Sequence, residues 1–369
     1  VDWLFAACAP DTELLPWNAQ FTPVDLPHDW QIRHADDLYR DGTLFYRKYF
    51  FVTDVPGIRR MLWFGGAYMD TTVFVNGTEV GQWKYGYTSF WFDITDALHE
   101  GQNEVLVRCN LRHPNSRWYS GAGLYRNVEL WEAPDLHLMP DGLYVAAKEG
   151  DNGAWTVAVT AEVGSVTAAS TGRTLTLHLT DDNGSLLGTA AIPADAWAAL
   201  PSPDGWRTGK ETAIYKASHT FTLQDPALWD LDAPNFYHIT AELTGADGVT
   251  DTLTTRFGCR TIEATPDCGL LVNHKRVLIK GVCIHHDFGC LGSAFEYSAA
   301  KRQLEILKSM GVNSIRTGHT PPAPQFMDLA DEMGILMDVE SFDCWRRGKN
   351  PYDYGRFFDE WQEKDVAAW

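Results

Sequence analysis

Histidine, arginine and acidic side chains follow three predicted strands in the last quarter of the chain. These groups are residues 285–287 (HHD), residues 316–319 (RTGH) and residues 338–340 (DVE). Catalytic groups of a β/α barrel lie at the C-terminal ends of its strands, which meet on one face. A single histidine at a strand end is more often a structural hydrogen-bonding residue. Titratable groups at three successive strand ends therefore favour an active site.

Metal binding is the weaker interpretation of these residues. His285 and His286 are neighbours, and adjacent residues of a strand point to opposite faces, so one ion cannot easily bind both. The sequence has no CxxC pair, which makes structural zinc unlikely on spacing alone. Cys344 has no neighbour that would lower its pKa, and an inert buried thiol is the better interpretation. We expect neither a metal nor another cofactor.

An aromatic loop at residues 116–121 (SRWYSG) leaves two interpretations open. Trp118 could pack into a core or a corner of the fold. A glycine-flanked loop that carries tryptophan and tyrosine could equally present a face on which a sugar stacks. The sequence favours neither interpretation.

The elements that would position the strand-end residues alternate between strand and helix. Strands are predicted at residues 277–282, 312–316 and 335–339, the first of them apolar on both faces. Helices are predicted after each strand: one capped by Ser298 and ended by Gly311, one ended by Gly334, and one over residues 357–369. The apolar positions expected in the first helix are Ala300, Leu304, Leu307 and Met310, and those in the second are Phe326, Leu329, Ala330 and Met333. Such units predict parallel strands with right-handed crossovers, as in an eight-fold (β/α) TIM barrel.

The rest of the chain predicts two β-sandwiches. Residues 1–133 contain short strands and an Asn76-Gly77 turn between two β-rich runs, which is typical of a type I′ hairpin, and we expect a jelly-roll sandwich there. Residues 134–257 alternate apolar and polar positions over further short strands, and we expect an immunoglobulin-like sandwich. Residues 258–369 are then the start of the barrel domain. Three barrel strands cannot close, so we expect the chain to be the front part of a longer protein.

Composition excludes several classes of partner. The 49 acidic against 30 basic side chains give a net charge of -19, which disfavours nucleic acid and anionic membranes. No apolar run reaches the roughly 18 residues that a membrane span needs. Seven scattered cysteines, an odd number, are typical of a reducing compartment, and we expect a cytoplasmic protein.

Five ordered motifs resemble the family 2 glycoside hydrolases, the β-galactosidase and β-glucuronidase group. They lie at residues 26–30 (LPHDW), 116–128 (SRWYSGAGLYRNV), 257–260 (FGCR), 271–282 (LVNHKRVLIKGV) and 315–322 (IRTGHTPP). The last motif has Gly318 where the family usually has serine. The resemblance covers essentially the whole chain.

The resemblance implies roles for individual residues. Arg316 is similar to the arginine that contacts the catalytic nucleophile, where a fixed guanidinium keeps a carboxylate ionised. His319 is similar to a histidine that lines the sugar subsite, and Glu340 to an orienting glutamate at the end of the third strand. His285 and Asp287 fall in a segment similar to RHED, and the resemblance makes them substrate-binding candidates.

Arg117 and Trp118 are the substrate-binding candidates in the aromatic loop. The family hydrolyses glycosides with retention, using two glutamates about 5–5.5 Å apart as acid/base and nucleophile. The resemblance places both glutamates after Trp369, so no catalytic residue is expected within this chain. Some members bind magnesium through a Glu-x-His pair after the third strand. Cys344 and Arg346 stand at those positions, so that site is not expected.

The resulting expectation is the N-terminal portion of a retaining β-glycosidase that acts on carbohydrate, most simply on β-galactosides. A β-glucuronidase or another family 2 β-glycosidase is the alternative activity. A carbohydrate-binding or assembly fragment without catalysis is the alternative from another class. We expect the 369 residues alone to be inactive and the full-length protein to form a homo-oligomer.

Overall fold

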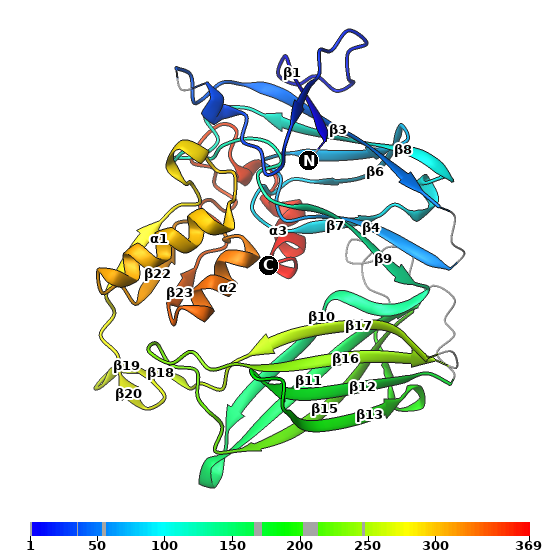
Figure 1. Ribbon diagram of the computed structural model, residues 1–369. Helices are drawn as coiled ribbons and strands as arrows, with labels where there is room; N and C mark the ends of the chain where they lie inside the picture. The colour runs from blue at the N-terminus through cyan, green and yellow to red at the C-terminus, as the bar shows by residue number, and fades with distance from the viewer. Residues whose placement is uncertain (1, 35, 54–56, 166–171, 202–212, 246–247) are drawn as a thin grey trace.

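Antiparallel strands build two sandwiches, and a short parallel sheet with three helices lies against both (Figure 1). The structure is a computed structural model that describes residues 2–34, 36–53, 57–165, 172–201, 213–245 and 248–369. None of the helices in these ranges has the length and apolar character needed to cross a membrane.

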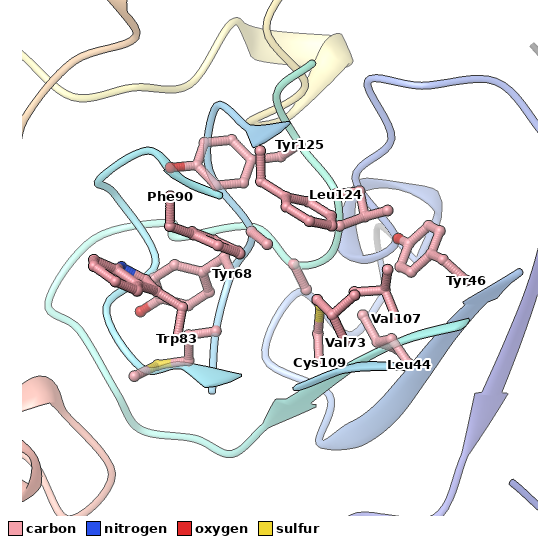
Figure 2. Close-up of a cluster of buried hydrophobic side chains, with 14 of the residues drawn as sticks. Leu44, Tyr46, Tyr68, Val73, Trp83, Phe90, Val107, Cys109, Leu124 and Tyr125 are labelled. Carbon is pink, nitrogen blue, oxygen red and sulfur yellow. The ribbon is translucent and has the colours of Figure 1, made fainter. Parts of the chain in front are cut away.

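The first sandwich consists of a six-stranded and a three-stranded sheet, with strand orders β2-β1-β3-β8-β5-β6 and β7-β4-β9. The strands are β1 Trp3–Cys8, β2 Thr22–Val24, β3 Gly42–Val52, β4 Ile58–Phe64, β5 Thr71–Val75, β6 Thr78–Trp83, β7 Phe90–Asp93, β8 Gly101–Leu111 and β9 Val128–Pro134. Leu44, Val73 and Val107 from the larger sheet are fully buried in the core that Figure 2 shows. Asn76 and Gly77 have φ of 50° and 79°, which confirms the predicted turn.

The second sandwich has two four-stranded sheets, with strand orders β10-β11-β15-β14 and β13-β12-β16-β17. The strands are β10 Leu136–Glu149, β11 Ala154–Ser165, β12 Thr174–Asp181, β13 Leu186–Pro193, β14 Ala198–Ala199, β15 Ala213–Gln224, β16 Tyr237–Gly245 and β17 Gly248–Phe257. Val157 and Val159 of β11 and Leu177 of β12 point into the core at no more than 1% exposure. The alternation predicted for these strands is confirmed. The jelly-roll and immunoglobulin-like assignments of the two sandwiches stay predictions.

Three strand–helix units follow a small antiparallel sheet. The antiparallel sheet contains β18 Ile262–Thr265, β19 Gly269–Val272 and β20 Lys275–Arg276. The parallel sheet contains β21 Gly281–Ile284, β22 Ser314–Thr317 and β23 Leu336–Val339, and the helices are α1 Tyr297–Ser309, α2 Pro324–Glu332 and α3 Phe358–Ala367. The order β21-α1-β22-α2-β23-α3 is the predicted series of parallel units.

Three local predictions in this part were wrong. The strand predicted at residues 277–282 begins only at Gly281, and Leu278 is 71% exposed. The Asn313 side chain accepts from the Lys280 N–H at 2.8 Å and donates to the Leu278 carbonyl at 3.0 Å. These two backbone groups are therefore bonded to a side chain and not to a neighbouring strand.

Ser298 does not cap α1. The Ala300 N–H already donates to the Glu296 carbonyl at 2.9 Å, so the helix begins at Tyr297 with Glu296 as its N-cap residue. Ala300 and Leu304 are buried as predicted, whereas Met310 lies beyond the last helical residue and is 72% exposed.

Both sandwiches hold the parallel sheet in place. On the first sandwich, the rings of Trp83 and Trp361 of α3 meet edge to face at 5.5 Å. On the second, Arg256 of β17 donates to Glu332 of α2 at 2.7 Å, and the Trp229 indole donates to the Asp331 carbonyl at 2.9 Å. The parallel strands therefore end next to loops of the first sandwich. Of their helices, α3 packs on the first sandwich and α2 is bonded to the second (Figure 1).

Candidate active site

The predicted strand-end residues meet because the three parallel strands are in register. Cys283 pairs with Arg316 and Arg316 with Asp338, and one step further Thr317 lies between Ile284 and Val339. The segments that follow therefore leave the sheet at one edge, as in the C-terminal face of a barrel.

Arg316, His319 and Glu340 form one hydrogen-bonded cluster at this edge. The Arg316 Nε and Nη2 atoms lie 2.9 Å and 2.6 Å from Glu340 Oε1. His319 Nδ1 lies 2.8 Å from Glu340 Oε2 and 3.2 Å from Arg316 Nη2. A carboxylate accepts only, so Nδ1 carries the hydrogen and donates to Glu340, which fixes the imidazole orientation. With this tautomer the Arg316 Nη2 atom only lies close to Nδ1 and does not bond to it.

The cluster is accessible from outside. The side chains of Arg316, Glu340 and His319 are 38%, 29% and 27% exposed, so a ligand could reach them in this structure. Hydrogen bonds to Cys283 and then to Glu340 raise the pKa of Arg316, which stays a cation at every ordinary pH. Glu340 uses both oxygens in these contacts, which suits the orienting role that the resemblance implies.

Trp118 closes one side of the cluster. Its indole stacks on the His285 ring with centroids 5.4 Å apart and planes at 9°, and its centroid lies 5.5 Å from that of His319. The indole N–H donates to the Tyr87 hydroxyl at 3.2 Å. The aromatic loop of the first sandwich thus reaches the ends of the parallel strands. The sequence alone had not decided the position of this loop.

Arg117 lies beside the cluster and not in it. Its Nη2 atom donates to Asp343 Oδ1 at 2.6 Å, and Lys349 Nζ donates to the same oxygen at 2.8 Å. Burial alone would raise the pKa of Asp343, but these two hydrogen bonds outweigh it and lower the pKa. The charge of Arg117 is therefore already met by a carboxylate.

His285 and His286 follow the last residue of β21 and contact different groups, the Trp118 indole and the Ser120 carbonyl. His286 donates through Nε2 to the Ser120 carbonyl at 2.8 Å, and burial lowers its pKa to about 4, so the ring is neutral at pH 7. No cluster of three or more potential metal ligands occurs in the described ranges.

Asp287 makes no hydrogen bond to the Arg316 cluster in the structure as described. Burial first, then the charge and hydrogen bond of Asp29, and last the charge of Asp287 raise the pKa of the Tyr119 phenol.

Asp29 is a site residue that residue-by-residue reasoning missed. Its Oδ1 atom accepts from the backbone N–H groups of Gln31 and Ala122 at 2.9 Å and 3.1 Å. Its Oδ2 atom accepts from the Tyr119 hydroxyl at 2.7 Å and from the N–H and hydroxyl of Ser293 at 2.8 Å and 3.0 Å. One buried carboxylate therefore ties the aromatic loop to the barrel loop after β21. The only sequence signal for this role was its place in the LPHDW motif.

Arg126 is a second missed residue, and it fixes the loop that follows His319. Its guanidinium is buried and donates to the carbonyls of Gly65, Tyr87 and Pro321 at 3.1 Å, 2.7 Å and 3.0 Å. Burial lowers the pKa of Arg126. The contact with Pro321 joins the first sandwich to the segment after β22.

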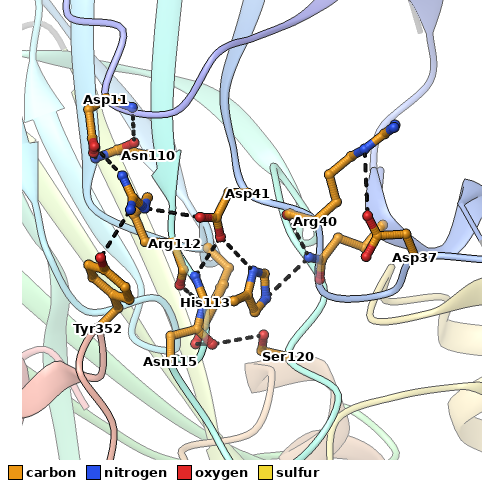
Figure 3. Close-up of polar contacts among 12 residues, drawn as sticks. Asp11, Asp37, Arg40, Asp41, Asn110, Arg112, His113, Asn115, Ser120 and Tyr352 are labelled. Carbon is orange, nitrogen blue, oxygen red and sulfur yellow. Dashed lines mark hydrogen bonds and ion pairs between the residues drawn. The ribbon is translucent and has the colours of Figure 1, made fainter.

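A polar network anchors the start of the aromatic loop (Figure 3). Asp41 accepts from the His113 N–H at 2.7 Å and pairs with Arg112 Nε at 3.1 Å. Arg112 also donates to the Tyr352 hydroxyl at 3.0 Å, and Asn115 donates to the Arg112 carbonyl at 2.7 Å. This network holds the loop base against the segment that leads to α3.

Two models of known protein families match parts of this chain. A family model described as glycosyl hydrolases family 2 matches residues 141–260, and one described as the TIM barrel domain of glycosyl hydrolases family 2 matches residues 264–355.

The relatives that resemble this chain are named for two activities. A beta-galactosidase of Bacteroides ovatus is 36% identical over 93% of this chain, and a putative beta-glucuronidase of Formosa agariphila is 32% identical over 94% of it. The chain spans only 40% and 33% of the length of these relatives.

Solved structures are similar to the chain over its whole length. A glycosyl hydrolase family 2 member from Bacteroides cellulosilyticus matches with a TM-score of 0.88 and 29% identity, over 100% of this chain and 48% of that one. A beta-glycosidase from Bacteroides vulgatus matches with a TM-score of 0.84 and 29% identity, over 100% of this chain and 47% of that one.

Proposed function

Because the chain belongs to glycosyl hydrolase family 2, we propose that it forms part of a retaining β-glycosidase and supplies one wall of its active site. The observation that carries this proposal is the cluster at the strand ends. Arg316 and His319 meet one carboxylate, Glu340, and the Trp118 indole lies across from them. Charged groups beside a flat aromatic face are suited to a sugar ring and its hydroxyls.

Neither catalytic carboxylate belongs to this chain in the proposal. A retaining enzyme needs one carboxyl group that protonates the leaving oxygen and a second that attacks the anomeric carbon. Glu340 cannot easily attack, because Arg316 and His319 already bind both of its oxygens. We propose that a segment following Trp369 contributes both glutamates.

The residues of this chain bind and orient in the proposed reaction. Glu340 accepts the Nδ1 hydrogen of His319, which leaves Nε2 free to bond with a sugar hydroxyl. Arg316 places a fixed positive charge near the nucleophile and favours its ionised form. Trp118 offers its ring to the apolar face of the sugar, next to His285.

A neutral sugar, first of all a β-galactoside, is the proposed substrate. A β-glucuronide would need a free cation for its carboxylate. Besides Arg316, whose guanidinium is bound to Glu340, Arg117 and Lys349 are cations beside this wall, and both are bound to Asp343. The glucuronidase alternative therefore requires a cation from elsewhere in the full-length protein.

The reducing compartment implied by composition is part of the proposal. All seven cysteines lie among the described residues, and none is bonded to another. Unpaired cysteines are typical of the cytoplasm. We propose a cytoplasmic enzyme.

The direct experiment is a substrate panel with the protein extended beyond Trp369. We expect release of nitrophenol from the 4-nitrophenyl β-galactoside, less from the β-glucuronide, and none from the α-galactoside. Preference for the glucuronide would replace the proposed substrate with its alternative. Binding of galactose without turnover of any β-glycoside would favour the non-catalytic, carbohydrate-binding interpretation.

A further inference from the structure

Cys283 is the third partner of the Arg316 guanidinium. The Arg316 Nη1 atom donates to Cys283 Sγ at 3.1 Å, while Nε and Nη2 face Glu340. Cys283 lies directly beside Arg316 in the register of β21 and β22. A planar guanidinium with donors engaged on two sides has little freedom to rotate.

Gly318 leaves the space that this thiol occupies. A Cβ atom at position 318 would lie 2.8 Å from Cys283 Sγ, 3.2 Å from Arg316 Nη1 and 3.5 Å from His285 Cε1. The first distance is shorter than any ordinary carbon–sulfur contact. Gly318 is absent from the glycines with positive φ among the described residues, so its backbone does not require glycine. Glycine is favoured at position 318 because a Cβ atom would collide with Cys283, and not because of its backbone dihedral angles.

Cys283 and Gly318 therefore depend on each other. A side chain at position 318 would have to displace the thiol or the guanidinium, and a smaller side chain at position 283 would leave room for it. We propose that Cys283 and Gly318 form a matched pair that sets the position of Arg316 relative to Glu340. Cys283 is thus a positioning residue that acts through Arg316.

This inference rests on the proposed function only where activity is the readout. In the extended enzyme we expect Gly318→Ser to lower kcat/KM by about tenfold or more, because the new side chain collides with Sγ and shifts the guanidinium. Cys283→Ala should lower kcat/KM by a few fold, since Arg316 loses one acceptor. The double variant Cys283→Ala/Gly318→Ser should recover to within about threefold of wild type, because the serine fits the space and its hydroxyl can accept from Nη1.

Two further variants separate positioning from simple packing. Cys283→Ser keeps an acceptor in place and should retain nearly full activity with an unchanged pH profile. Cys283→Val fills the space without an acceptor, and its kcat/KM profile should shift on the acidic side, because Arg316 no longer sits where it favours the ionised nucleophile. Cys268→Ala, at an exposed cysteine in the turn between β18 and β19, is the matched control and should change nothing.

An activity-independent measurement keeps the test decisive. Thermal unfolding of the 369-residue chain should show that Gly318→Ser lowers Tm and that adding Cys283→Ala restores most of the loss. If the two substitutions instead add independently in both Tm and kcat/KM, the matched pair is refuted. If the coupling in Tm is present but no β-glycoside is hydrolysed by the wild-type extended protein, the proposed function fails and the pair stands.

Discussion

The indole of Trp118 lies flat on the imidazole of His285, with the ring centroids 5.4 Å apart and the planes at 9°. The two residues belong to different parts of the fold, a loop of the first sandwich and the end of β21. Their contact puts an aromatic wall from one domain beside the strand ends of another. The candidate site is therefore a joint product of the sandwich and the barrel segment.

The first prediction concerns this wall. In the extended enzyme, Trp118→Ala should raise KM and lower kcat, because the sugar loses its stacking face and His285 loses its support. Trp118→Phe keeps a ring and should retain most of kcat/KM. Trp17, which is 97% exposed, is the control position, and Trp17→Ala should leave both constants unchanged. A Trp118→Ala variant with normal kcat/KM and a lower Tm would mean that the loop only packs.

The second prediction concerns Asp29 as a structural tie. Asp29→Asn should lower the free energy of unfolding by about 2–4 kcal/mol. In the wild type, Tyr119, Ser293 and Ala122 donate to the carboxylate, and the amide N–H₂ of asparagine cannot accept from them. Asp37→Asn changes a carboxylate that is 54% exposed and should stay within about 0.5 kcal/mol of wild type. Chemical denaturation of the chain measures both. Equal stability of the two variants would contradict the role of Asp29.

The third prediction concerns pH and the carboxyl group of Asp365 in α3. Asp365 is fully buried and accepts hydrogen bonds from the hydroxyls of Tyr354 and Thr88. Burial raises its pKa from 3.8 to about 7, against the smaller effects of these hydrogen bonds and of Lys364. A carboxyl with a raised folded pKa binds its proton more tightly in the folded state. Its contribution to the free energy of unfolding is therefore fully present below about pH 4, falls as the pH rises to about 7, and is level above that.

Comparison with Asp365→Asn isolates this contribution. The stability of wild type minus that of the variant should fall, on the order of a few kcal/mol, between pH 4 and pH 8. Burial lowers the pKa values of His28 and His286 to about 4, so these two residues lower the free energy of unfolding as the pH falls, opposite to the effect of Asp365. That effect is common to both proteins and cancels in the difference. A difference that does not vary with pH would show that Asp365 is ionised throughout.

The fourth prediction concerns Arg316. Arg316→Met in the extended enzyme should lower kcat/KM by roughly 10²–10³-fold, because the fixed charge near the nucleophile is lost. The acidic limb of the pH profile should move to higher pH, since a nearby cation lowers the pKa of a carboxylate by about 1–3 units. Arg346→Met is the matched control, because Arg346 is 72% exposed, pairs with Asp359 and lies 6.0 Å from the Phe358 ring centroid, away from the Arg316 cluster's hydrogen bonds. A folded Arg316→Met enzyme with wild-type rate and pH dependence would make Arg316 a brace for the barrel wall.

Features fixed by local sequence were predictable. The Asn76-Gly77 turn and the buried stripe of Ala300 and Leu304 depend on residues within a few positions of one another, and both are present. The strand-end positions of Arg316 and Glu340 followed from the strand–helix period. The beginning of β21 was not predictable, because Asn313, more than 30 positions away in the chain, supplies the partners of the preceding segment.

Features that join distant segments needed the structure. Asp29 accepts from Tyr119, Ala122 and Ser293, and these separations of about 90 to 264 residues leave no local pattern. The position of Trp118 against His285 was open for the same reason. Arg126 could be found as a motif residue, but its three carbonyl acceptors could not.

The stereochemistry of hydrolysis tests the central proposal most directly. Proton NMR of the extended protein acting on 4-nitrophenyl β-galactoside should show the β-anomer of galactose first, with the α-anomer appearing only through later mutarotation. A double displacement gives this result, and it requires two glutamates that the 369-residue chain does not provide in our account, so that chain alone should give no product. The α-anomer as the first product, or no product from the extended protein, would contradict the assignment of this chain to a retaining β-glycosidase.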